Sequence, residues 1–282
     1  MTIRLLAVGD EPALAAFLDG HRDGSMFLRS SSREAGVVYA GQPRQADYMA
    51  AFRDGAIVGV AAHAWNGMLQ LQAPERADEL AAACVAASAR KVTGLIGPLS
   101  HVKAARTALG MDHVVARKDD DSEALFALEL AELVMPARLE RGDVTARPAV
   151  AQDRDLLCEW RVAYDCEILG GEATAEARRS AAGFIDWQIA EGVAWLALHD
   201  GVPVAFSGFN CVLPDTVQLG GIFTPPELRG QGHAKAAIAA QLLAARRSGV
   251  ERAVLFASDS KAIRCYAGLG FRRVGDFGLV LW

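Results

Sequence analysis

The sequence predicts an α+β fold with two tandem halves, each a mixed, mostly antiparallel sheet flanked by helices. Two observations lead to this prediction. The same order of elements occurs twice along the 282 residues: a strand, helices, a meander of strands, a helix, a strand, a helix and a strand. Turns of the Asp-Gly or Asn-Gly type separate apolar runs at Asp54, Asn66 and Asp200. We therefore expect two domains, over residues 1–140 and 141–282.

In the first half, Asp54-Gly55 and Asn66-Gly67 mark a meander, because both residues of such a pair tolerate the positive φ of a tight hairpin turn. The expected elements are a strand over 3–7, a helix over 11–18 with Asp10 as N-cap, irregular chain with short helical pieces over 20–44, strands over 48–53, 56–65 and 68–72, a helix over 74–87 with Pro74 at an early position, a strand over 93–97, a helix over 100–109, a loop over 118–121, a strand over 123–133 and a linker over 136–143.

The second half repeats the order. Thr174 is expected to cap a helix, and Asp200-Gly201 to form a hairpin turn. The expected elements are a strand over 144–150, helices over 151–169 and 175–190, strands over 195–199, 202–213 and 216–223, a helix over 235–248, a strand over 253–257, a helix over 262–269 and a strand over 272–282.

Composition excludes several classes of protein. A hydrophobic fraction of 52% with 22% charged residues is typical of a globular chain, and a net charge of −5 without a basic block argues against a nucleic-acid partner. Five cysteines without a C-x-x-C pair predict neither disulfides nor a metal site. The N-terminus lacks the apolar core of a signal peptide, and charged residues interrupt every apolar run. We expect a cytoplasmic protein that does not bind a membrane.

The stretch around Arg229-Gly230-Gln231-Gly232 organises the second half. A predicted strand feeds this glycine-containing turn, and a long Ala/Leu-rich helix follows. The first amides of a helix have no intrahelical partner and point the same way, so such a turn suits a phosphate group. By itself the pattern is more typical of a tight strand-to-helix turn than of a phosphate site. The stretch also lacks the Ser or Thr of a nucleotide P-loop after Lys235.

Two motifs together give a more specific signal. Arg229, Gly232 and Ala234 match [Q/R]-x-x-G-x-[G/A], and Pro226 precedes them. Downstream, residues 259–271 match N-x-x-A-x-x-x-Y-x-x-x-G-F with Asp in the first position. In these motifs and their order, the second half resembles the GNAT superfamily of N-acetyltransferases. The resemblance implies that acetyl-CoA is a cosubstrate and that the chain is an acyltransferase.

The resemblance also implies where the cosubstrate lies. The thioester would lie at the strand end formed by Ile222, Phe223 and Thr224, where the central strands of the family separate. The pyrophosphate would lie on the backbone amides of residues 229–234, with Arg229 and Lys235 balancing its charge. This set of loop residues is Arg229, Gly230, Gln231, Gly232, His233, Ala234 and Lys235. His233 would contribute its amide and not its imidazole.

Tyr266 matches the family tyrosine near the thioester sulfur. A phenol with an ordinary pKa near ~10 is protonated at neutral pH and can donate a proton to a departing thiolate. The alternative is a tyrosine that only packs its ring against the sheet. Asp259 replaces an Asn that binds the cofactor in the family, so Ser260 is a candidate to take over that contact.

No general base stands out. Thr216 and Gln218 occupy the polar positions of the strand before the loop, and Asp215 is as typical of a turn residue. Asp165, Glu167 and Glu172 lie around the helices where family acceptor sites are built, although exposed carboxylates are common there.

The first half lacks both motifs. At the loop position it has Gln72-Ala73-Pro74-Glu75-Arg76-Ala77, with no glycine and an acidic side chain. It also lacks the tyrosine of the second motif. We expect this half to be a degenerate GNAT-like domain that binds no cofactor.

The sequence thus predicts direct acetyl transfer from acetyl-CoA to a primary amine, carried by a small molecule or a peptide, in a ternary complex. The alternative is a non-catalytic acyl-CoA-binding sensor or interaction module. Neither the acceptor nor the oligomeric state follows from the sequence.

Overall fold

The computed structural model describes residues 1–120 and 123–282, which form two compact units. The first unit comprises Met1–Leu125 together with Gly275–Trp282, and the second comprises Phe126–Val274. The compact units therefore divide the chain differently from the predicted ranges 1–140 and 141–282. The end of the chain completes the sheet of the first unit, and β7 (Ala124–Glu129) completes that of the second.

In the first unit the strands follow the order β1-β2-β3-β4-β5-β13, with β6 on the other side of β13. The pairs β1–β2, β2–β3, β3–β4 and β5–β13 are antiparallel, whereas β4–β5 is parallel. The strands are β1 (Thr2–Leu5), β2 (Ala46–Arg53), β3 (Ala56–Ala64), β4 (Met68–Gln72), β5 (Gly94–Pro98), β6 (Lys118–Asp120) and β13 (Arg272–Leu281). The helices are α1 (Glu11–Asp19), α2 (Met26–Ala35), α3 (Ala77–Ser88) and α4 (Leu99–Ala108).

In the second unit the order is β7-β12-β11-β10-β9-β8. The pairs β8–β9, β9–β10 and β10–β11 are antiparallel, and β11–β12 is parallel. The strands besides β7 are β8 (Thr145–Pro148), β9 (Ala194–His199), β10 (Val202–Val212), β11 (Thr216–Phe223) and β12 (Arg252–Ala257). The helices are α5 (Ala137–Glu140), α6 (Arg154–Ile168), α7 (Ala175–Ala190), α8 (His233–Arg247) and α9 (Ser260–Ala267), with short 3-10 turns at Leu130–Glu132, Ala151–Asp153 and Pro226–Leu228.

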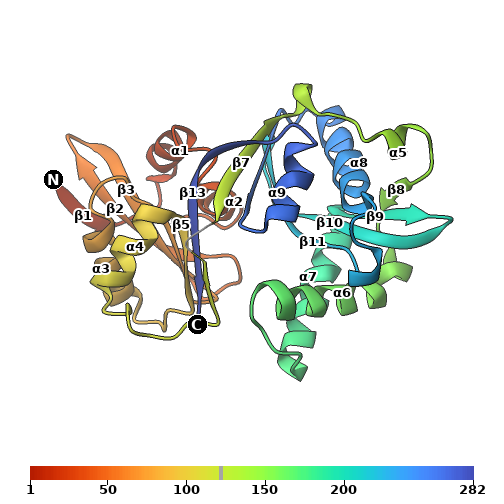
Figure 1. The fold of residues 1–282 in the computed structure, drawn as a ribbon. Coiled ribbons are helices and arrows are strands. Elements are labelled where there is room, and N and C mark those ends of the chain that lie inside the picture. Colours follow the sequence, from red (N-terminus) through yellow and green to blue (C-terminus); the bar gives the residue numbers. More distant parts are fainter. Residues whose placement is uncertain (121–122) are drawn as a thin grey trace. The chain divides into compact units, whose positions relative to one another are not determined.

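Alternating residues of the strands face helices on both sides of each sheet. In the second unit, Ala197 and Ala205 pack against Ala236 and Ala237 of α8. Their neighbours Leu196 and Phe206 pack with Leu157 of α6 and Ile185 of α7. Because successive side chains of a strand point to opposite faces, α8 covers one face of this sheet and α6 and α7 cover the other (Figure 1).

The first unit has the same layering. Leu80 of α3 and Val102 of α4 pack on one face of its sheet, beside Leu69 of β4. Leu14 of α1 and Leu28 of α2 pack on the other face. The predicted α+β class with mostly antiparallel sheets is confirmed.

Several elements differ from the sequence expectation. Residues 20–44 contain a full helix, α2, which buries Met26 and Leu28 despite its polar composition. Helix α3 begins after Arg76, whose left-handed backbone (φ 58°) breaks the helix expected from Pro74. Residues 118–120 pair with β13 as a strand instead of forming a loop, and residue 121 of that expected loop lies outside the described residues.

Two further differences concern the region where the halves join. The expected strand over 123–133 ends at Glu129 and continues as a 3-10 turn. The expected linker over 136–143 contains α5. None of the described helices is both long and apolar enough to cross a membrane.

Candidate active site

The second unit opens between its two parallel strands. Strands β11 and β12 pair from Thr216–Arg252 to Gln218–Val254, and no later pair joins them in the described chain. On its other side β11 stays paired with β10 as far as Phe223 opposite Phe206. The last residues of β11 therefore have backbone groups that face away from β10 without a neighbouring strand. This is the separation that the sequence resemblance implies near Ile222, Phe223 and Thr224.

Thr224 adds a polar group at this strand end. Its Oγ1 is buried and has no hydrogen-bond partner among the residues that the structure describes, whereas its carbonyl accepts a hydrogen bond from Arg229 Nε at 2.9 Å. A buried hydroxyl without a partner is costly, so its environment suits a polar ligand atom. Phe223 is buried beside Trp160, with ring centroids 6.1 Å apart, and forms the apolar side of the same strand end.

The loop after β11 presents a row of free amides. The backbone N–H groups of residues 230–234 have no acceptor in the described part of the chain. Gly230 (φ 76°) and Gly232 (φ 80°) both have left-handed backbone, and a Cβ on either would meet open space. The glycines are therefore needed for the backbone conformation and not to avoid a clash. Helix α8 begins at His233 with no side-chain cap, so its N-terminal partial charge faces the loop.

Arg229 is not available as the loop's counter-charge in this arrangement. Its Nη1 and Nη2 donate to Oε1 and Oε2 of Glu167 on α6, both at 2.7 Å. The pKa of the Glu167 carboxyl is lowered, chiefly by this hydrogen bond. The pair removes Glu167 from the set of ready bases, since an ionised carboxylate held by a guanidinium is a weak proton acceptor.

Sequence reasoning missed a second arginine at the loop. Arg138 of α5 donates from Nη1 to the carbonyl oxygen of Gln231 at 2.5 Å. A linker was predicted for the segment that carries Arg138. The helix observed there (Ala137–Glu140) has only four residues, which is too short for hydrophobic periodicity to indicate it. No sequence signal other than its proximity to the second half could have linked Arg138 to the loop.

The next residues of the loop point in different directions. The His233 imidazole is buried, with its Nδ1 unpartnered and its ring 5.7 Å from that of His199. Burial lowers its pKa, and the nearby Arg138 and His199 add to this, which keeps the ring neutral. The ammonium of Lys235 lies against Gly268 at the end of α9, where a Cβ would overlap it. No acidic partner of Lys235 occurs among the described residues.

Helix α9 places Tyr266 in the interior. Its side chain is buried and meets Phe271 edge-on, with ring centroids 6.0 Å apart. Burial raises the pKa of the phenol, and Cys265, Tyr164 and Asp259 raise it further. The phenol is thus protonated at any physiological pH, as a proton donor requires. At the start of the helix, Asp259 accepts from the Lys261 amide at 2.9 Å and acts as N-cap, while Ser260 is exposed.

Two of the remaining candidate carboxylates, Asp165 and Asp215, have structural partners. Asp165 pairs with Arg161 at 3.0 Å. Asp215 accepts a hydrogen bond from Thr216 at 2.8 Å, and its carbonyl binds the amide of Arg252 at 3.1 Å, as expected of a turn residue. Glu172 is exposed beyond α6. Thr216 and Gln218 are buried in the sheet. The structure does not identify any of these side chains as a general base.

The corresponding region of the first unit is closed. After the parallel pairs of β4 and β5, a Cβ on Gly97 would overlap the carbonyl oxygen of Leu71, so the strands stay in contact. The amide of Ala73 donates to Nδ1 of His101 at 3.1 Å. Burial lowers the pKa of His101 to about 4, which keeps that nitrogen free to accept. Glu75 binds Arg53 in an ion pair.

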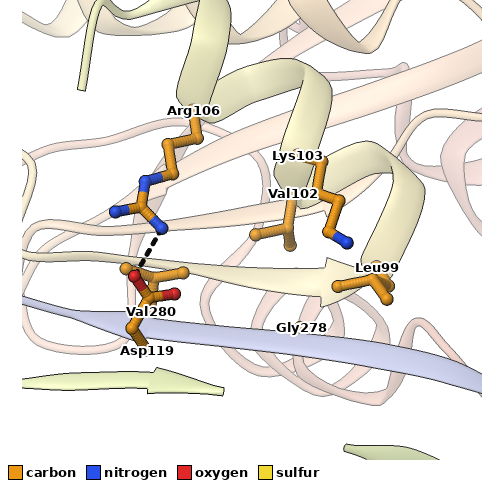
Figure 2. A pocket seen from close by; sticks show the side chains of 7 residues that line it. All are labelled: Leu99, Val102, Lys103, Arg106, Asp119, Gly278 and Val280. Atoms are coloured by element: carbon orange, nitrogen blue, oxygen red, sulfur yellow. Dashed lines mark hydrogen bonds and ion pairs between the residues drawn. The ribbon is translucent and has the colours of Figure 1, made fainter. Parts of the chain in front are cut away.

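A hollow of about 330 Å³ lies elsewhere in the first unit, between α4, β6 and β13 (Figure 2). Val102 and Val280 form its apolar side, and Lys103 and Arg106 line it as well. Arg106 donates to Asp119 at 2.7 Å and to the carbonyl of Met111 at 3.2 Å, so it holds the chain between α4 and β6. This hollow contains none of the residues of the two sequence motifs.

Comparison with known proteins gives the family. Residues 157–271 match the model of the acetyltransferase (GNAT) family. No curated protein sequence matches the chain at a significant level.

Solved structures resemble the chain over its whole length. A GNAT-family acetyltransferase from Colwellia psychrerythraea is 14% identical with a TM-score of 0.57, covering 100% of both chains. A tandem GNAT protein from the clavulanic acid biosynthesis pathway is 16% identical with a TM-score of 0.56, covering 99% of this chain and 97% of that one. A GCN5-related N-acetyltransferase from Sphaerobacter thermophilus is 16% identical with a TM-score of 0.60, covering 99% and 94%.

At these identities the structures establish the fold alone, and their full coverage is consistent with two GNAT-like halves. The matched family model lies within the unit that carries the glycine loop and Tyr266. Residues 157–271 therefore match the GNAT acetyltransferase family, and this match together with the fold supports an acyltransferase.

Proposed function

We propose that the second unit transfers an acetyl group from acetyl-CoA to a primary amine by direct attack in a ternary complex. The observation that carries this proposal is the row of unpaired amides over residues 230–234, set by two left-handed glycines at the start of α8. Such a row binds a diphosphate without further charged side chains.

The residues at the strand end fit the rest of the cosubstrate. The backbone groups of β11 after Gln218 lack a neighbouring strand on the β12 side, and Thr224 Oγ1 lacks a partner. A pantetheine chain carries amide groups that pair with free backbone groups, as an added strand would. When bound, acetyl-CoA supplies the acetyl group as a thioester.

Tyr266 is the proposed general acid. In the reaction, the amine nitrogen forms a bond to the acetyl carbon while the bond from that carbon to sulfur breaks. The Tyr266 hydroxyl gives its proton to the departing sulfur, the amine loses one proton to water, and water returns a proton to the Tyr266 phenolate. The burial of the phenol supports this role, because it keeps the proton on oxygen until a negative charge develops nearby.

Holding the two reactants side by side supplies much of the rate in such a direct transfer. The amine would enter near α6 and α7 and be carried by a small molecule or a peptide. Since Asp165 and Glu167 are both held in ion pairs, we propose that water removes the amine proton.

A non-catalytic acyl-CoA sensor is the second candidate. The same ion pairs favour it, because they occupy two of the three candidate carboxylates on the acceptor side. A sensor has no need for a buried proton donor, so Tyr266 distinguishes the two.

The first unit would bind no cosubstrate. Gly97 lies in close contact with Leu71, which leaves no space between the strands as there is in the second unit. The Ala73 amide donates to His101, so it is not a free donor like the loop amides of the second unit. We propose that its role is to shape the enzyme and not to bind acetyl-CoA. All five cysteines are free thiols, which fits a reducing cytoplasm.

Titration calorimetry with acetyl-CoA, combined with a thiol-release assay over a panel of primary amines, tests the function. One site per chain with thiol release for at least one amine is expected. Binding without release for any amine favours the sensor, and absence of binding contradicts the proposed loop function.

A further inference from the structure

Arg138 contacts the glycine loop from outside the part of the chain that matches the family model. Its Nη1 reaches the carbonyl oxygen of Gln231 at 2.5 Å, across 93 residues of sequence. The matched region begins at residue 157, so this contact belongs to the present chain and not to the motif.

The helix that carries Arg138 is fixed to α8. Leu139 packs against the hydrophobic cluster that includes Val144, Ala236 and Ala237, and the amide of Val144 donates to the Arg138 carbonyl at 3.2 Å. Ala236 and Ala237 lie in the first turns of α8, directly after the loop. These contacts place the backbone of Arg138 beside the start of α8 and the glycine loop.

The contact determines which way one peptide group faces. In a trans peptide the C=O and the following N–H point in opposite directions, and the described chain contains no cis peptide. While Arg138 holds the Gln231 carbonyl, the N–H of Gly232 points away from Arg138. That N–H is one of the unpaired amides of the loop.

Without this anchor the peptide has unusual freedom. Gly230 and Gly232 flank Gln231, and glycine adopts either sign of φ at little cost. A flipped Gln231–Gly232 peptide would present a carbonyl oxygen where a diphosphate needs a donor. A hydrogen bond from a cation also polarises the peptide and strengthens its N–H as a donor.

Charge supports the same assignment. Arg229, the cation that the motif supplies, is paired with Glu167. Arg138 has no carboxylate within ion-pair distance among the described residues. Its charge is therefore uncompensated beside the loop.

We propose that Arg138 is a positioning residue of the acetyl-CoA site, which holds the Gln231–Gly232 peptide with its N–H directed at the diphosphate. This inference rests on the proposed function of the loop. Arg138 acts through the loop backbone, so its loss weakens binding of the cosubstrate and leaves the chemical step intact.

The test compares Arg138→Gln, Arg138→Lys and the control Arg141→Gln in the full chain. Arg141 ends the same helix but is exposed and pairs with Asp143 at 2.7 Å. Arg138→Gln is expected to raise the Kd and KM for acetyl-CoA about tenfold, with kcat at saturation within about twofold. Arg138→Lys, which keeps the charge and a donor, should recover most of the affinity, and Arg141→Gln should match the wild type.

Thermal melting of each variant shows whether the fold is retained. Equal Kd values for Arg138→Gln and Arg141→Gln in folded proteins would overturn this inference and leave the proposed function standing. A fall in kcat with unchanged KM would also overturn it. If the wild type itself binds no acetyl-CoA, the proposed function fails and this inference fails with it.

Discussion

Arg147 binds Asp153 through both terminal nitrogens, at 2.6 and 2.9 Å, and the same carboxylate accepts from the amide of Val150 at 2.8 Å. The first unit contains the same arrangement at the same spacing. Arg4 binds Asp10 at 2.7 and 2.8 Å, and Asp10 accepts from the amide of Ala7 at 2.8 Å. In both units the arrangement joins the first strand to the first helical turn.

This repeated contact is structural support for two related halves. It also corrects the expected role of Asp10, whose carboxylate binds Arg4 and Ala7 and caps no helix amide by its side chain. The spacing Arg-x₅-Asp is too common to be recognised by itself, so the repeat becomes visible only when the contacts are known.

Asp153→Asn should destabilise the second unit near neutral pH by about 1–3 kcal/mol, because a charged hydrogen-bonded pair loses one member. The pKa of Asp153 is lowered, chiefly by Arg147. A carboxyl whose folded pKa is depressed stabilises the protein above its ordinary pKa of ~3.9, and that contribution is lost as pH falls through the folded pKa.

Denaturant unfolding at several pH values measures the effect. The difference between wild type and Asp153→Asn should shrink below about pH 4. Asp155→Asn is the matched control, since Asp155 is 96% exposed in the same helix start. A difference that stays constant with pH would rule out the ionised pair as its source.

Tyr266→Phe should reduce kcat by about a hundredfold or more, the range of general-acid contributions. The affinity for acetyl-CoA should stay within a few-fold, because the hydroxyl has no hydrogen-bond partner among the described residues and its removal therefore breaks no contact of the fold. Thiol-release kinetics and calorimetry measure the two quantities separately. Equal turnover in wild type and mutant would contradict the role of general acid.

Gly232→Glu should abolish binding of acetyl-CoA to the whole chain. The substitution strains a left-handed backbone position and places an anion beside the free amides. Gly249→Glu is the control, since Gly249 also has positive φ (95°) and open space around a Cβ but lies at the other end of α8. Residual stoichiometric binding by Gly232→Glu in calorimetry would show that the first unit still holds a cosubstrate.

Gly268→Ala tests the placement of Lys235. The backbone of Gly268 is right-handed (φ −72°), so alanine is tolerated there, but its Cβ would displace the Lys235 ammonium. We expect a two- to fivefold weaker Kd for acetyl-CoA, about the size of one partly exposed charge contact. Lys235→Met should give a similar loss, and the double variant should add little to either. Fully additive losses would show that Gly268 acts independently of Lys235.

Much of the fold could be predicted because turns and helix caps depend on short stretches of sequence. The Asp54-Gly55 and Asp200-Gly201 turns lie in hairpins as expected, and Thr174 caps α7 through a hydrogen bond from Ala177 at 3.1 Å. Helix α2 was missed because its serines have weak helix propensity, and burial of Met26 and Leu28 overrides it.

The local conformation of the glycine loop was predictable to a similar degree. Glycines spaced by one residue before a helix favour a left-handed backbone at each glycine, and this preference is local. Two contacts at the site were not predictable. Arg229 pairs with Glu167, 62 positions away, and Arg138 contacts Gln231, 93 positions away. The sequence gives the charge of a side chain but not the residue with which it pairs.

The sequence by itself determined the α+β class and the glycine loop, because turn geometry and helix periodicity are local properties of the chain, and its resemblance to the GNAT motif singled out Tyr266. Only the tertiary structure decided that the final strand pairs with β5 of the first unit and that β7 joins β12 of the second. Strands pair through backbone groups that nearly every residue carries. The hydrophobic pattern of a strand therefore predicts which face is buried but not which strand lies beside it.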